Sequence, residues 1–100
     1  MWRGCLASSN VVVVRRRALV SGRVQGVFYR AAAEREAARL GVAGWARNLN
    51  DGRVELVVEG DPHAVDSFIR WAWRGSPRSE VAGVEVNDEP PEGLTSFRTR

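Results

Sequence analysis

The sequence predicts an α+β domain in which two helices cover one face of an antiparallel sheet. Runs rich in β-branched residues and segments with apolar residues at helical spacing follow one another as strand, helix, strand, strand, helix, strand. The Asp51-Gly52 pair separates the two central strand-like runs and is typical of a tight hairpin. This order defines the split βαβ sandwich, the ferredoxin-like arrangement, with a short terminal strand added.

The first part of the chain supplies one strand and one helix. The strand is predicted from Val11 to Ser21, and we expect the arginines at 15–17 to be solvated at a strand edge. A helix is predicted over residues 28–40 and ends before Gly41. Its apolar positions recur on one face: Tyr29, Ala33, Ala37 and Leu40.

The central hairpin is predicted from two strand-like runs, 42–50 and 53–60. Asp51 and Gly52 between them favour a two-residue type I′ turn, because that turn needs a positive φ at both central residues. Glu55 and Glu59 alternate along the second run, and we expect both to be solvated. The two runs are therefore antiparallel neighbours.

The last part of the chain predicts a second helix and two further strands. Asp61 is the expected N-cap of this helix, Pro62 its first residue, and Gly75 marks its end. We expect Trp71 and Trp73 to pack at the edge of the core. A fourth strand is predicted from the valines at 81, 84 and 86, and a short last strand from 97 to 100, after the acidic, proline-rich loop 88–93.

Composition limits the classes of function. A chain of 100 residues with 44% hydrophobic and 27% charged residues predicts one globular domain. No apolar run approaches the roughly 20 residues that a membrane helix needs. All fifteen positive residues are arginine, which fits arginine-biased coding first and, as the alternative, phosphate binding through the planar guanidinium. A net charge of +3 is too small to indicate nucleic-acid binding.

The N-terminal segment gives expectations about compartment and domain bounds. Cys5 is the only cysteine, so no internal disulfide can form and a reducing compartment is expected. Residues 1–10 lack the continuous apolar core of a secretory signal. We therefore expect a disordered extension over 1–10, a folded domain over 11–100 and a cytoplasmic location.

A glycine-bearing loop from Gly22 to Arg30 leads from the first strand into the first helix. Unpaired backbone N–H groups at such a place can converge on an anion, and the helix dipole adds to the attraction. Arg30 in the first turn could close over the same anion. The loop by itself equally fits a tight strand-to-helix turn that needs glycine for backbone reasons.

A second segment, from Gly44 to Glu55, contains the end of one hairpin strand, the turn and the start of the next strand. Taken alone it indicates only a hairpin. Asn48 would then be one more polar residue near the turn.

The two segments together resemble the acylphosphatase family. The first family motif matches Gly22-x-Val24-Gln25-Gly26-Val27-x-Tyr29-Arg30, and the second matches Gly44-Trp45-x-Arg47-Asn48-x-x-Asp51-Gly52-x-Val54-Glu55. Arg30 and Asn48 are 18 positions apart, as in the family. The resemblance covers roughly residues 15–100. Ala46 and Thr99 depart from the family's usual residues, and the chain ends at Arg100 where many members continue, which affects the expected packing of the last strand.

The resemblance implies an enzyme that hydrolyses the carboxyl-phosphate bond of small acyl phosphates without metal or cofactor. Arg30 would hold the phosphate and Asn48 would position the attacking water. The backbone N–H groups of the loop would share the phosphate oxygens: Gln25, Gly26, Val27, Phe28, Tyr29 and Arg30. Inorganic phosphate would be a product and a competitive inhibitor, and no nucleic acid or membrane partner is implied. A monomer is the expected state.

Two other functions compete with this interpretation. A non-catalytic module of the same family could bind phosphate or a partner surface without turnover. An RNA-binding ferredoxin-like domain would need aromatic residues on the central strands, and the run from Val54 to Glu59 has none. His63 is the only histidine and is expected to be a surface residue, and no spacing of cysteine, histidine and carboxylate residues predicts a metal site.

Overall fold

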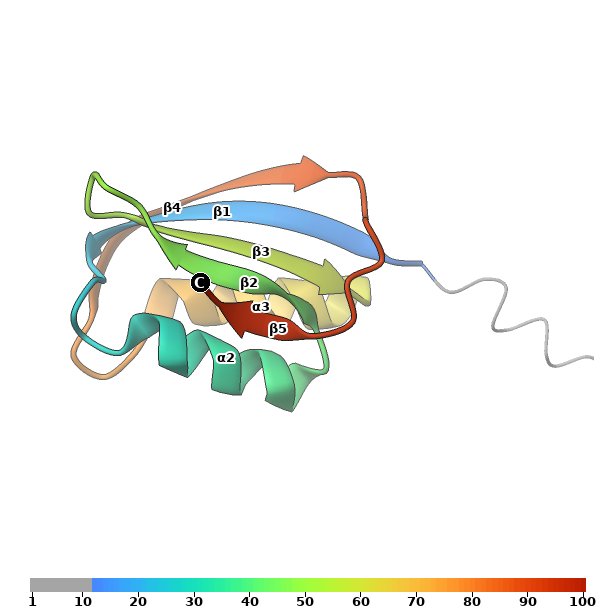
Figure 1. Ribbon diagram of the computed structural model, residues 1–100, viewed down its shortest axis with the longest axis horizontal. Coiled ribbons are helices and arrows are strands. Elements are labelled where there is room, and N and C mark those ends of the chain that lie inside the picture. The colour runs from blue at the N-terminus through green and yellow to red at the C-terminus, as the bar shows by residue number, and fades with distance from the viewer. Residues whose placement is uncertain (1–11) are drawn as a thin grey trace, which may run out of the picture.

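The computed structural model describes residues 12–100, so the extension predicted over 1–10 lies outside the described residues. The elements follow one another along the chain as β1 (Val14–Arg23), α2 (Tyr29–Leu40), β2 (Ala43–Asn48), β3 (Val54–Gly60), α3 (Pro62–Arg74), β4 (Glu80–Glu89) and β5 (Phe97–Thr99). The strands form one sheet in the order β4-β1-β3-β2-β5, and both helices lie on the same face of it (Figure 1). The predicted α+β, ferredoxin-like fold is confirmed.

The terminal strand makes the sheet mixed. All other neighbouring strands are antiparallel, but β5 pairs parallel to β2, with Gly44 opposite Phe97 and Ala46 opposite Thr99. The backbone N–H of Arg100 also donates to the carbonyl of Ala46 at 2.8 Å. The chain end is therefore fixed beside β2 despite the residue changes at positions 46 and 99.

Helix α3 begins and ends where its sequence predicts. The Asp61 carboxylate accepts hydrogen bonds from the backbone N–H groups of His63 and Ala64, and Pro62 occupies the first turn. At the other end, the N–H of Gly75 donates to the carbonyl of Trp71. The described part of the chain contains no helix that is both long and apolar enough to span a membrane.

The turn between β2 and β3 differs from its prediction. The N–H of Gly52 donates to the carbonyl of Leu49, and the N–H of Leu49 donates to the carbonyl of Arg53. Of the two central residues, only Gly52 has a positive φ (94°), whereas a type I′ turn would need one at Asp51 as well. The Asp51 carboxylate instead accepts from the backbone N–H of Arg53, which favours a longer loop.

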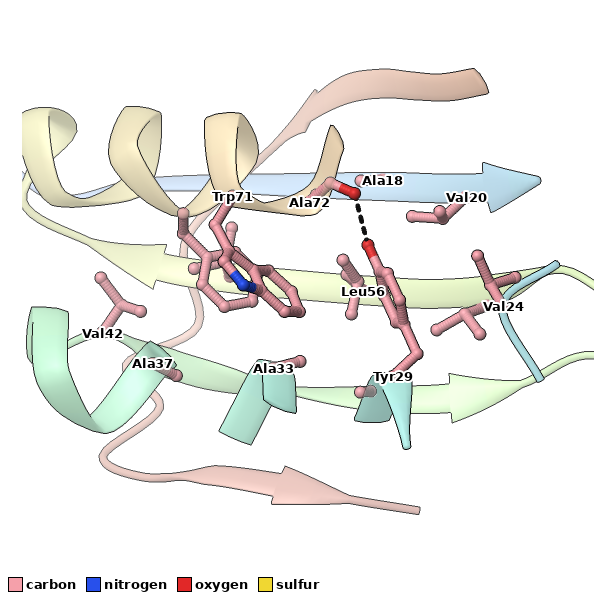
Figure 2. Packing of buried hydrophobic residues seen from close by; sticks show 14 of the residues in the cluster. Ala18, Val20, Val24, Tyr29, Ala33, Ala37, Val42, Leu56, Trp71 and Ala72 are labelled. Atoms are coloured by element: carbon pink, nitrogen blue, oxygen red, sulfur yellow. Dashed lines mark hydrogen bonds between the residues drawn. The ribbon is translucent and has the colours of Figure 1, made fainter. Parts of the chain in front are cut away.

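The core lies between the sheet and the two helices (Figure 2). Alanines on α2 bring that helix close to the sheet, and Tyr29 fills the space at its N-terminal end, where its hydroxyl donates to the carbonyl of Ala72 at 2.7 Å. Trp71 belongs to this core and contacts the rings of Tyr29 and Phe68. Trp73, expected at the edge of the core, is 54% exposed. It lies outside the buried face of α3, which ends with Trp71 and Ala72.

The opposite face of the sheet carries ion pairs where the sequence predicts solvated charges. Strand β1 is central and not an edge, so Arg15 is buried between Glu59 and Glu89, and Arg17 pairs with Glu55. Glu55 also pairs with Arg47 from β2. The expectation that these glutamates and arginines are solvated is therefore wrong, because side chains on adjacent strands cover one another.

Glu59 connects the sheet to the segment that leads into β5. Its carboxylate accepts hydrogen bonds at 2.8–2.9 Å from three successive backbone N–H groups, those of Glu92, Gly93 and Leu94, and it is only 3% exposed. Burial by itself raises the pKa of the Glu59 carboxyl, but these N–H groups and Arg15 outweigh it, and the net effect lowers the pKa.

Glu59→Gln is expected to lower the free energy of unfolding by about 1–3 kcal/mol at pH 7, because an amide cannot accept from all of these donors. A carboxyl with a lowered pKa in the folded state stabilises the protein above about pH 5, and this stability is lost as the pH falls through the lowered pKa. The free energies of unfolding of the variant and the wild type, measured with urea, should therefore differ at pH 7, and the difference should shrink as the pH falls through the lowered pKa.

Glu85→Gln is the matched control, since it removes the same charge from an exposed position on β4. A Glu59→Gln variant that behaved like this control at pH 7 would contradict the role given to Glu59.

Candidate active site

The loop between β1 and α2, residues 24–28, lies at the end of the sheet where the β2–β3 hairpin also turns (Figure 1). Gly26 and Phe28 have left-handed backbone, with φ of 74° and 62°, whereas the intervening Val27 does not. Such an alternation points successive N–H groups towards one place. A Cβ added at Gly26 would meet no atom within 4 Å, so backbone conformation and not crowding selects glycine there.

The N–H groups of this loop have no partner in the protein. Within residues 12–100, no group accepts a hydrogen bond from the backbone N–H of any residue from 25 to 30. The last two of these residues also form the start of α2, where the helix dipole is positive. We call residues 25–30 the cradle, because this arrangement is suited to binding an anion.

Two side chains fix the cradle through carbonyl groups and leave its N–H groups unused. The Gln25 amide donates to the carbonyls of Leu49 and Arg53 in the β2–β3 hairpin, at 2.8 and 2.9 Å. The buried Ser76 hydroxyl, in the loop after α3, donates to the carbonyl of Val27 at 2.7 Å. Sequence reasoning missed both side-chain contacts; the only signal was that Gln25 and Ser76 fall within stretches that resemble the family.

Arg30 and Asn48, which lie 18 positions apart in the sequence, line the same pocket. The pocket has a volume of about 280 Å³ and is lined by Val24, Gly26, Phe28, Tyr29, Arg30, Ala31 and Asn48. Strand β3 separates β1 from β2, so the two residues meet because the β1–α2 loop and the end of β2 lie at the same end of the sheet. The structure thus brings both predicted catalytic residues and the cradle together.

Asn48, which lines this pocket, carries an unsatisfied polar atom. Its Oδ1 is buried and has no hydrogen-bond partner. Among the described residues, it is the one buried side-chain nitrogen or oxygen of which this is true. An unpaired buried acceptor costs roughly 1–3 kcal/mol. Such an atom can accept a hydrogen bond from a donor that reaches it with a ligand.

Arg30 supplies the positive charge of the pocket. Its Nη1 donates to the backbone oxygen of Arg100 at 2.5 Å, which holds the half-buried Arg30 beside the end of β5. Tyr29 contributes no charge, because burial raises the pKa of its hydroxyl far above neutrality.

A larger pocket, of about 510 Å³, lies between the C-terminal half of α2 and the segment 93–97. Its ionisable lining residues are Glu34 and Glu59, so it has no positive side chain to attract a phosphate. Across residues 12–100, no group of three or more histidine, cysteine, aspartate or glutamate residues could hold a metal ion. The 280 Å³ pocket is the candidate active site, because it combines Arg30 and Asn48 with residues of the cradle.

The fold and this pocket define a small α+β protein whose β1–α2 loop is suited to binding an anion. A family model described as Acylphosphatase matches residues 16–99. The chain is 57% identical over 79 residues to an acylphosphatase of Rubrobacter xylanophilus, covering 79% of this chain and 72% of that one. It is 53% identical over 85 residues to one of Thermococcus kodakarensis, covering 85% and 93%.

The solved structures agree with the sequence matches. The crystal structure of acylphosphatase from Bacillus subtilis superposes with a TM-score of 0.85 at 39% identity, covering 87% of this chain and 98% of that one. The chain belongs to the acylphosphatase family. It is an enzyme that hydrolyses acyl phosphates, as its sequence predicts.

Proposed function

We propose that the chain hydrolyses the carboxyl-phosphate bond by capturing the phosphoryl group in the cradle and placing a water molecule with Asn48. The observation that carries this proposal is the buried, unpartnered Oδ1 of Asn48, a residue that lines the same pocket as Arg30 and the cradle. Phosphoryl transfer depends mainly on positioning and on stabilising charge, and these three features supply both.

The cradle and Arg30 would bind the phosphoryl oxygens. The N–H groups of residues 25–30 have no partner in the described chain and can each donate to an oxygen. Arg30 can donate two parallel hydrogen bonds from its planar fork. Because Gln25 and Ser76 already fix the loop, little ordering is required when the phosphate binds.

Asn48 would orient the attacking water. Its Oδ1 is an acceptor and can take a hydrogen bond from the water, while a neutral amide adds no charge to bind the anion. Asn48 ends β2, which pairs with β3 on one side and β5 on the other, so its position is rigid.

The reaction then needs no strong acid from the protein. The water oxygen forms a bond to phosphorus while the bond from phosphorus to the acyl oxygen breaks, and the carboxylate leaves with the electron pair. A phosphoryl oxygen of the substrate takes the water proton, so the products are a carboxylate and inorganic phosphate. A carboxylate is a good leaving group, which fits a pocket without a carboxylic acid or histidine among its lining residues.

Several further properties are part of the same proposal. Inorganic phosphate should inhibit competitively, since the cradle would recognise the group that substrate and product share. The protein would act as a cytoplasmic monomer on small acyl phosphates, with no nucleic-acid or membrane partner.

Turnover of acetyl phosphate by the purified protein, with and without EDTA, is the test. We expect activity to survive the chelator, because Arg30 provides the cation that a metal would otherwise supply. Phosphate binding without turnover would indicate a non-catalytic module. Loss of turnover in EDTA, restored by added magnesium or zinc, would contradict the metal-independent mechanism.

A further inference from the structure

Phe28 stands at the edge of the candidate active site in a conformation that its own residue type disfavours. It is the one non-glycine residue with a positive φ among residues 12–100. A bulky side chain in the left-handed region is strained, and such strain persists where the surrounding structure or a function maintains it.

The position is also unfavourable for phenylalanine in two other respects. Phe28 is the N-cap of α2, where serine, threonine, aspartate or asparagine would accept a hydrogen bond from the first turn, and its side chain makes no such bond. Its side chain is 72% exposed, while the neighbouring Val27 and Tyr29 are buried. Backbone, capping and burial preferences therefore all disfavour the residue that is present.

The pocket has an apolar side to which Phe28 belongs. Arg30, Asn48 and the cradle N–H groups account for the phosphoryl group and the water under the proposed function. The remaining side chains that line the pocket and carry no polar atom are those of Val24, Phe28 and Ala31. None of them can contribute to holding a phosphate.

In-line attack requires the water and the leaving acyl oxygen to lie on opposite sides of the phosphorus atom. With water at the buried Oδ1 of Asn48, the acyl group would extend away from Asn48 and towards the solvent-exposed part of the pocket. Phe28 is the exposed aromatic residue that lines this pocket.

We propose that Phe28 contacts the acyl group and makes the enzyme prefer acyl phosphates with an aromatic or otherwise apolar acyl group over acetyl phosphate. This inference rests on the proposed function. An aromatic ring stacks favourably on another ring and covers apolar surface that would otherwise face water, whereas acetyl offers a single methyl group.

The test compares kcat/KM for benzoyl phosphate and acetyl phosphate in the wild type, Phe28→Asn and Phe28→Gly. Asparagine and glycine both accept the left-handed backbone, so these variants remove the ring and keep the shape of the loop. We expect the ratio of benzoyl to acetyl kcat/KM to fall about tenfold in both variants. The inhibition constant of inorganic phosphate should stay within about twofold, because the cradle N–H groups are unchanged.

Trp73→Ala is the control, since it removes an aromatic ring that is 54% exposed and does not line the pocket. It should leave the ratio unchanged. An unchanged ratio in the Phe28 variants would overturn the inference. Equal losses of kcat/KM for both substrates would also overturn it, whether or not phosphate inhibition weakened, because they would show that Phe28 only maintains the shape of the loop. If the wild type hydrolysed neither substrate, the proposed function itself would fail.

Discussion

Arg30→Ala is expected to lower kcat/KM for acetyl phosphate by about 10³-fold or more and to weaken inhibition by inorganic phosphate. Arg30 is the only positive side chain that lines the candidate pocket within the described chain, so no neighbour can replace its charge. The loss should affect both the bound ground state and the transition state, because phosphate and the transferring phosphoryl group share the same oxygens. Steady-state kinetics with phosphate as inhibitor measure both effects.

Arg30→Lys separates charge from geometry. Lysine keeps a positive charge but loses the planar fork, so its activity should lie between those of the wild type and the alanine variant. Arg35→Ala is the matched control, because it removes an exposed arginine one turn further along α2. Arg30 also bonds the oxygen of Arg100, so thermal unfolding of each variant is needed to show that it is folded. A folded Arg30→Ala protein with near-normal turnover would contradict the assignment.

Asn48→Ala is expected to lower kcat by roughly 10²- to 10³-fold and to leave the inhibition constant of phosphate nearly unchanged. The amide can orient water by hydrogen bonds but has no charge with which to bind an anion. Its Oδ1 has no partner in the described chain, so removing it breaks no internal hydrogen bond of that atom. Turnover, phosphate inhibition and thermal unfolding should be measured on one preparation, because they give kcat, the inhibition constant of phosphate and the stability of the variant.

The competing explanation is that Asn48 only supports the hairpin. In that case Asn48→Ala would be less stable, and its folded fraction would keep wild-type turnover. Asn50→Ala is the control for the turn itself, since Asn50 is exposed in the same hairpin and does not line the pocket. A folded Asn48→Ala protein with wild-type kcat would end the water-positioning hypothesis.

Much of the fold could be predicted because its signals are local. Asp61 and Pro62 start α3 where the sequence indicates, and the helical spacing from Tyr29 to Leu40 gives α2 to within one residue. The type of turn between β2 and β3 was predicted wrongly. The Asp-Gly pair fits several turns, and the choice depended on the hydrogen bond that Gly52 makes to Leu49.

The tertiary partners of charged side chains could not be predicted. The arginines of β1 and the glutamates of β3 look solvated in isolation, and only the sheet order shows that they neutralise one another. At the site, Asn48 alone indicated nothing beyond a hairpin, and its proposed role came from the resemblance of two linked motifs. The side-chain bonds of Gln25 depend on a hairpin 24 and 28 residues away, so no local pattern indicates them.

The lining of the pocket has a further consequence for how the rate should respond to acidity. Its seven residues include no carboxylic acid, histidine or cysteine, and burial raises the pKa of the Tyr29 hydroxyl. The bell-shaped profile that an acid and base pair imposes has no source in these side chains. Across the range in which the protein is folded, bends in the rate profile would therefore come from the ionisation of the substrate. Under the proposed mechanism the protein would bind and position the substrate and the water, and the groups that gain or lose protons would be those of the substrate.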